Sequence, residues 1–137
     1  LEMLHEGGAA IRAVFSALAA DTFDAVVFHC SGGKDRTGVV AALVLRSLGV
    51  PDATIVEDYS LSEVNLAEAV REYRAQLEEA GLDSSAIAYL TSSPPERMLY
   101  TLAELDRRWG STDCYLQRIG VDGETLDRLR RNLLEAG

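Results

Sequence analysis

The sequence predicts an α/β fold, and two observations lead to this class. A short apolar, β-branched run at residues 25–28 is typical of a buried strand. Most of the remaining chain carries apolar residues at helical spacing, in segments that end at glycine or proline. We therefore expect one strand set among several helices.

The segment before the strand is predicted to be one helix. Its apolar residues from Leu4 to Leu18 fall on a single face, and the helix is expected to end near Ala20. Asp21 and Thr22 interrupt the pattern before the strand begins.

The segment after the strand predicts the most deeply buried helix. Residues 37–48 are apolar nearly all round, as expected of an element in the middle of a domain. Gly49 and Pro51 end this helix.

Two capping boxes predict where later helices begin. Ser60 with Glu63 starts one helix, and Ser93 with Glu96 starts another with proline at its first position. Three shorter helices complete the prediction: one over residues 82–90, one around Cys114 and an amphipathic one at the C-terminal end.

The loop between strand and helix reads His-Cys-Ser-Gly-Gly-Lys-Asp-Arg-Thr-Gly, from His29 to Gly38. A helix N-terminus has unpaired amides and a partial positive charge, so it stabilises an anion. Glycines allow the loop amides to turn inward. The sequence therefore predicts a phosphate-binding loop that also accepts sulfate, formed by Ser31, Gly32, Gly33, Lys34, Asp35 and Arg36.

The side chains around this loop suit chemistry on a phosphoryl group. Cys30 is the candidate nucleophile, because a neighbouring arginine and a helix N-terminus favour the thiolate. Arg36 offers a planar fork for two phosphoryl oxygens, and the Thr37 hydroxyl is expected to donate to the sulfur. Asp35 is a candidate general acid or a residue that holds the loop.

Two further residues are expected to shape the loop. His29 is predicted to fix it through ring hydrogen bonds, and Gly38 to permit close packing of the following helix.

This pattern resembles the active-site signature of the protein tyrosine phosphatase superfamily. The run from Lys34 to Gly38 is similar to a bacterial branch with tyrosine, serine/threonine and phosphoinositide activity. The resemblance implies Cys30 as nucleophile, Arg36 as phosphate clamp, Thr37 as thiolate stabiliser, and Lys34 and Asp35 as contributors specific to this loop. The reaction would hydrolyse a phosphate monoester through a phosphocysteine, without a cofactor or metal.

The resemblance also implies a central, mostly parallel sheet flanked by helices. A single strand cannot pair its own backbone N–H and C=O groups. In relatives the other strands come largely from sequence before the loop, and only 29 residues precede Cys30 here. Residues 1–137 are therefore expected to be the C-terminal part of one phosphatase-like domain, which supplies one strand and mainly helices, with the N-terminal strands absent.

The same reasoning applies to the proton that the leaving oxygen needs. In the superfamily an aspartate on a separate loop usually supplies it. Asp21 and Asp24 lie at the far end of the expected strand from the loop, so they are poor candidates. Either Asp35 supplies the proton or the acid precedes Leu1, and we favour the second.

Several alternatives stay open beside this interpretation. A protein that carries phosphotyrosine is the leading candidate substrate. Phosphoinositide is the second candidate, because Lys34 would add a cation at the mouth of the phosphate-binding loop, which suits a multiply phosphorylated headgroup. A silent phosphate-binding protein would keep the loop without the acid, and a thiol redox or sulfur-transfer protein could also use Cys-x5-Arg. Cys114 is expected to be a packed small hydrophobe.

Composition limits the classes of partner and the cellular locations that we expect for this chain. The net charge of −9 argues against a nucleic-acid surface, and no segment has the apolar length of a membrane span. Two cysteines make no disulfide framework and favour a reducing, cytoplasmic location, although the missing initiator methionine leaves secretion open.

Overall fold

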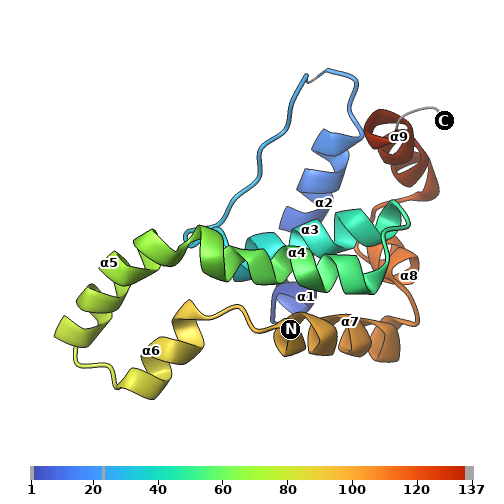
Figure 1. The fold of residues 1–137 in the computed structure, drawn as a ribbon. Coiled ribbons are helices and arrows are strands. Elements are labelled where there is room, and N and C mark those ends of the chain that lie inside the picture. The colour runs from blue at the N-terminus through green and yellow to red at the C-terminus, as the bar shows by residue number, and fades with distance from the viewer. Residues whose placement is uncertain (1, 23, 135–137) are drawn as a thin grey trace.

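The computed structural model describes residues 2–22 and 24–134, and within them the chain forms helices and no strand (Figure 1). In chain order the helices are α1 (Glu2–Glu6), α2 (Gly8–Leu18), α3 (Asp35–Ser47), α4 (Asp52–Asn65), α5 (Ala67–Glu79), α6 (Ser84–Thr91), α7 (Pro95–Trp109), α8 (Thr112–Arg118) and α9 (Gly123–Leu133).

The expected central parallel sheet is wrong for this structure. Residues 25–30 form neither helix nor strand, and Val27 is 88% exposed. Figure 1 shows the corresponding blue segment running apart from the helices between α2 and α3. A β-branched run favours extended backbone, but a ladder needs a neighbouring strand to pair its N–H and C=O groups. The described residues supply no such neighbour.

Helix α3 lies at the centre of the molecule because it contributes to both apolar clusters. Val40 and Leu43 pack in a cluster with residues of α1, α2, α7, α8 and α9. Ala42 packs in a second cluster with residues of α4 and α7. This confirms that the helix following the loop is buried between other elements. The loop therefore lies at the N-terminus of a helix that packs in both clusters.

Arg46 ties α3 to two of its neighbours. Its guanidinium donates to both carboxylate oxygens of Asp52 at 2.7 and 2.6 Å, at the start of α4. It also donates to Asp106 of α7 at 2.7 and 2.9 Å. Paired, two-pronged contacts of this kind fix orientation as well as proximity, so the three helices are held in a defined arrangement.

Two predicted helix boundaries are wrong, and a third is right to within one residue. The single first helix is divided at Gly7 into α1 and α2. Ser60 and Glu63 lie inside α4, where the Ser60 hydroxyl donates to the carbonyl of Val56. At Ser60 the local motif is overridden because the neighbouring Tyr59 packs in a core cluster within a longer helix. Helix α7 begins at Pro95, one residue later than predicted and with proline at its first position, but the Ser93 side chain does not cap it.

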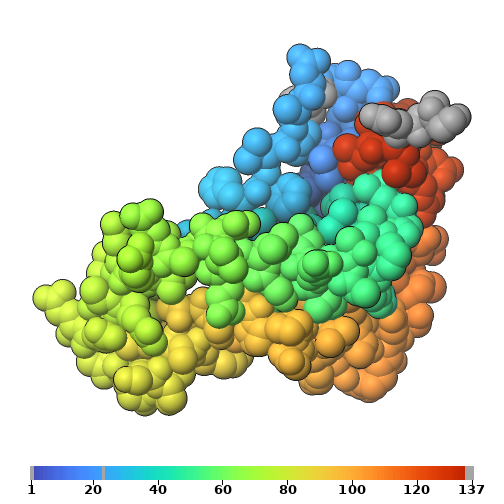
Figure 2. Space-filling view, viewed as in Figure 1, coloured from blue at the N-terminus to red at the C-terminus, as the bar shows by residue number. Residues whose placement is uncertain are grey.

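Helices α5 and α6 form an arm that projects from one end of the molecule (Figures 1 and 2). Helix α5 has no buried residue, and α6 buries Ile87 alone. The side chain of Asp83 caps α6 by accepting from the amides of Ser85 and Ala86.

None of the helices in the described ranges is long and apolar enough to cross a membrane.

Candidate active site

The loop from Cys30 to Arg36 turns back on itself and leads directly into α3. Gly33 has a φ of +61°, a left-handed conformation that glycine adopts without the penalty of a Cβ. Its amide donates to the carbonyl of Cys30 at 3.4 Å. Helix α3 begins at Asp35, two residues earlier than predicted, so Arg36 and Thr37 lie in its first turn.

The Cys30 sulfur is surrounded by hydrogen-bond donors from this loop. The Thr37 hydroxyl donates to it at 3.2 Å, which is the contact expected from the sequence. Burial alone would raise the pKa of the thiol, but the Thr37 hydroxyl and the amides of Thr37, Lys34 and Gly32 lower it to about 6. The thiolate is therefore the main form at neutral pH.

Arg36 lines the same pocket as Cys30 and is exposed. Its Nη2 donates to the Ser31 hydroxyl at 2.7 Å. Ser31 lines this pocket as well. A guanidinium at this position has further N–H groups available for an anion held over the sulfur.

The pocket around Cys30 has a volume of about 420 Å³ and two kinds of wall. The loop forms one side, and the arm forms the other through Val70 and Tyr73 of α5 and Leu90 and Thr91 of α6. No residue of this wall is among the site residues predicted from the sequence. The sequence signal for this wall is the apolar face of α5. The structure shows that this face packs against no core, because α5 has no buried residue.

Lys34 does not extend into solvent at the mouth of the pocket. Its side chain is 8% exposed, and its ammonium donates to the carbonyls of Leu90 and Ser92, each at 2.7 Å. Desolvation lowers the pKa of this ammonium, and the nearby Asp35 carboxylate opposes that shift. The cation expected to face substrate is thus directed at the backbone of the arm.

Asp35 is held by partners from three directions. Its Oδ1 accepts from the Tyr59 hydroxyl at 2.8 Å and lies 3.3 Å from Arg97, and its Oδ2 lies 3.5 Å from Lys34. Burial, together with the hydrogen bond to Asp35, raises the pKa of Tyr59 to about 12. Asp35 therefore forms the boundary between the Cys30 pocket and a neighbouring pocket.

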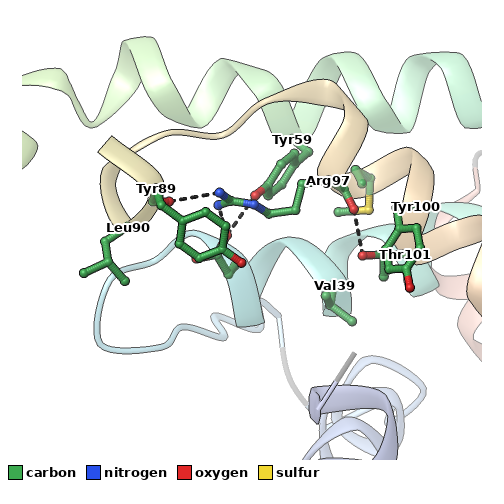
Figure 3. Close-up of a pocket in the computed structure, with 9 residues that line it drawn as sticks. Val39, Tyr59, Tyr89, Leu90, Arg97, Tyr100 and Thr101 are labelled. Carbon is green, nitrogen blue, oxygen red and sulfur yellow. Dashed lines mark hydrogen bonds and ion pairs between the residues drawn. The ribbon is translucent and has the colours of Figure 1, made fainter. Parts of the chain in front are cut away.

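The neighbouring pocket, of about 440 Å³, lies behind the loop (Figure 3). Tyr59, Tyr89, Arg97 and Tyr100 are among the residues that line it. Figure 3 shows the Arg97 side chain extending toward the carbonyl of Tyr89, with Tyr59 beside it. This cluster supports the back of the loop through Asp35.

The remaining predicted residues are placed as follows. Gly38 allows α3 and α4 to approach closely, because a Cβ there would meet the Tyr59 ring at 2.8 Å. His29 is exposed, and its role in the loop stays a prediction. Asp21 and Asp24 line a different pocket, beside the end of α2. Cys114 is exposed on α8, so the prediction that it is packed is wrong.

A titration of Cys30 reactivity tests this arrangement. We expect the rate of alkylation by iodoacetamide to rise with pH around a midpoint of about 6, because the thiolate forms as the pH passes the pKa. Thr37→Ala should move the midpoint upward, since the hydroxyl is the strongest of the contributions that lower this pKa. Thr37→Ser keeps the hydroxyl and should keep the midpoint. An unchanged midpoint in Thr37→Ala would contradict the assignment.

Comparison with known proteins places this site in a family context. Residues 1–135 match the model of a family described as "Tyrosine phosphatase family". The chain is 33% identical over 135 residues to "Tyrosine-protein phosphatase" of Nostoc commune, with 92% of this chain and 45% of that protein covered. It is 32% identical over 124 residues to "Triple specificity protein phosphatase PtpB" of Mycobacterium tuberculosis, with 80% and 44% covered. The chain thus spans less than half the length of these two relatives.

Proposed function

This chain belongs to the tyrosine phosphatase family, and we propose that it hydrolyses phosphate monoesters through a covalent phosphocysteine at Cys30. In the first step the thiolate attacks phosphorus, a P–S bond forms and the P–O bond to the leaving group breaks. The leaving oxygen takes up a proton from a general acid or from water. In the second step water attacks phosphorus, the P–S bond breaks and inorganic phosphate is released.

The observation that carries this proposal is the environment of the Cys30 sulfur. Loop amides and the Thr37 hydroxyl converge on it, and they lower its pKa to about 6 despite burial. The same donors that stabilise a thiolate also stabilise phosphoryl oxygens placed above it. In the second step the thiolate is the leaving group, so the Thr37 hydrogen bond assists both steps.

We propose Arg36 as the phosphate clamp and Asp35 as the residue that organises the loop. Arg36 is exposed beside Cys30, and only the Ser31 hydroxyl accepts from it among the contacts of the described residues. Asp35 already accepts from Tyr59 and pairs with Arg97. These contacts favour a structural role for Asp35 over donation of the proton.

Phosphotyrosine in a protein is the substrate that the pocket supports best. Val70 and Tyr73 give the wall opposite the loop an apolar and aromatic character, which suits the ring of phosphotyrosine. Phosphoinositide is the second candidate, and because one relative is named for triple specificity, activity should be compared on several classes of substrate.

A thiolate nucleophile also has to stay reduced, which favours a reducing compartment such as the cytoplasm.

Turnover of p-nitrophenyl phosphate, together with inhibition by vanadate, tests the proposed function. We expect steady release of p-nitrophenol and its suppression by vanadate, which resembles phosphate during transfer. Binding of phosphate without turnover would favour a silent phosphate-binding protein. Thiol reactivity that is insensitive to vanadate would favour a redox or sulfur-transfer protein.

A further inference from the structure

Three charged side chains from three elements hold the last residues of α6 and the two residues that follow it. We call residues 89–93 the connector. Lys34 at the start of α3, Glu63 on α4 and Arg97 on α7 each bind its backbone directly. The backbone of the connector is therefore held by three charged side chains that lie outside α6.

Lys34 makes the most buried of these attachments. Two of its three ammonium hydrogens are directed at the carbonyls of Leu90 and Ser92, both at 2.7 Å. A buried ammonium is costly unless its donors are satisfied. The carbonyls at the C-terminal end of a helix carry partial negative charge, so a cation there is also stabilised by the end of α6.

Arg97 and Glu63 hold the same segment from the other helices. Arg97 donates to the carbonyls of Ser92 and Tyr89, both at 2.9 Å, and its guanidinium lies 4.7 Å from the centre of the Tyr89 ring. Figure 3 shows Arg97 extending toward Tyr89. Glu63 accepts from the amide of Ser93 at 2.9 Å. Glu63 is not among the residues that line the Cys30 pocket.

The connector matters because it carries part of the pocket wall. Leu90 and Thr91 line the Cys30 pocket opposite the loop. Helix α5 buries no residue and α6 buries Ile87 alone, so apolar packing contributes little to holding the arm. Besides the chain itself, which joins α5 to α4 through Leu66, the charged contacts to the connector set the distance between this wall and Cys30.

We propose that Lys34, Glu63 and Arg97 are positioning residues, which fix the connector so that Leu90 and Thr91 contact the organic part of the substrate while the loop holds its phosphate. This inference rests on the proposed function. Under this proposal Lys34 attaches the loop to the arm and does not bind an additional phosphate of the substrate. Loss of any one of the three should loosen the wall and leave the amides around Cys30 in place.

The cleanest test uses Glu63, because it touches the connector and lies outside the pocket. We expect Glu63→Ala to raise KM for a phosphotyrosine peptide by about five- to tenfold with kcat little changed, as for lost ground-state binding. Competitive inhibition by inorganic phosphate should stay the same, since the loop holds phosphate. Glu63→Gln keeps an acceptor for Ser93 and should restore KM. Glu57→Ala, an exposed glutamate on the same helix, is the matched control.

Lys34→Met distinguishes attachment from headgroup recognition. Under this proposal it lowers kcat/KM by the same factor for the peptide and for a phosphoinositide, and Arg97→Met gives the same pattern. A clearly larger loss on the phosphoinositide for Lys34→Met alone would overturn it, as would a KM in Glu63→Ala equal to that of Glu57→Ala.

Hydrogen exchange separates failure of this inference from failure of the proposed function. In Glu63→Ala and Lys34→Met, exchange should become faster in residues 89–93, relative to wild type, whether or not the protein turns over p-nitrophenyl phosphate. Unchanged exchange there would overturn the inference even in an active phosphatase. Absence of turnover in wild type, with faster exchange in the variants, would instead overturn the proposed function alone.

Discussion

Cys30→Ser is expected to reduce turnover of p-nitrophenyl phosphate by a factor on the order of 10⁴ or more, the scale seen when a covalent nucleophile is removed. A serine hydroxyl stays protonated at neutral pH, and within residues 2–22 and 24–134 the only side chain hydrogen-bonded to this position is the Thr37 hydroxyl, which is not a base. The donors that lower the pKa of the Cys30 thiol to about 6 cannot bring an alcohol into that range. Phosphate affinity should change little, because the loop amides and Arg36 are retained.

The matched control is Cys114→Ser, which removes the other cysteine. Cys114 is exposed on α8, outside the Cys30 pocket, so its variant should keep wild-type rates. Rates are measured with p-nitrophenyl phosphate and phosphate binding by calorimetry. Near-normal turnover in Cys30→Ser would remove the covalent mechanism.

The site was more predictable from sequence than the fold because its geometry is local. Cys30, Gly33 and Thr37 lie within eight residues, and the Gly33 turn and the start of α3 bring them together without help from distant segments. The family that the loop resembles is confirmed by the match over residues 1–135.

The sheet and several helix ends could not be predicted because they depend on partners distant in sequence. Residues 25–28 have strand-forming side chains, yet a ladder is a property of two segments. The capping box at Ser60 was overridden because Tyr59 packs in the core beside it, as part of a longer helix. Local propensity is a weak prior wherever tertiary packing competes with it.

Lys34 shows the same limit within the site. Its position in the loop motif suggested a cation facing substrate, and nothing nearby in sequence indicates otherwise. Its partners, the carbonyls of Leu90 and Ser92, lie 56 and 58 residues away. The direction of a long side chain depends on what the fold places beside it, so the motif alone left the role of this residue open.

Arg36→Lys is expected to lower kcat/KM by roughly 10²- to 10³-fold, the cost of losing one well-placed group that stabilises developing charge. Arg36 lies in the first turn of α3, with its guanidinium beside Ser31 at the edge of the Cys30 pocket. A guanidinium can bind two phosphoryl oxygens in one plane, whereas an ammonium acts as a point charge. Retaining the positive charge should therefore recover only a small part of the rate.

The pH dependence of Cys30 alkylation shows which property of Arg36 is lost. Arg36 is not among the largest contributions that lower the pKa of Cys30, so Arg36→Lys should keep the alkylation midpoint at about 6 while turnover falls. Arg131→Lys, on the exposed face of α9, is the matched control and should leave both unchanged. A large upward shift of the midpoint would mean that Arg36 acts by stabilising the thiolate. Near-normal turnover in Arg36→Lys would instead mean that the loop amides hold the phosphoryl group without a two-pronged clamp.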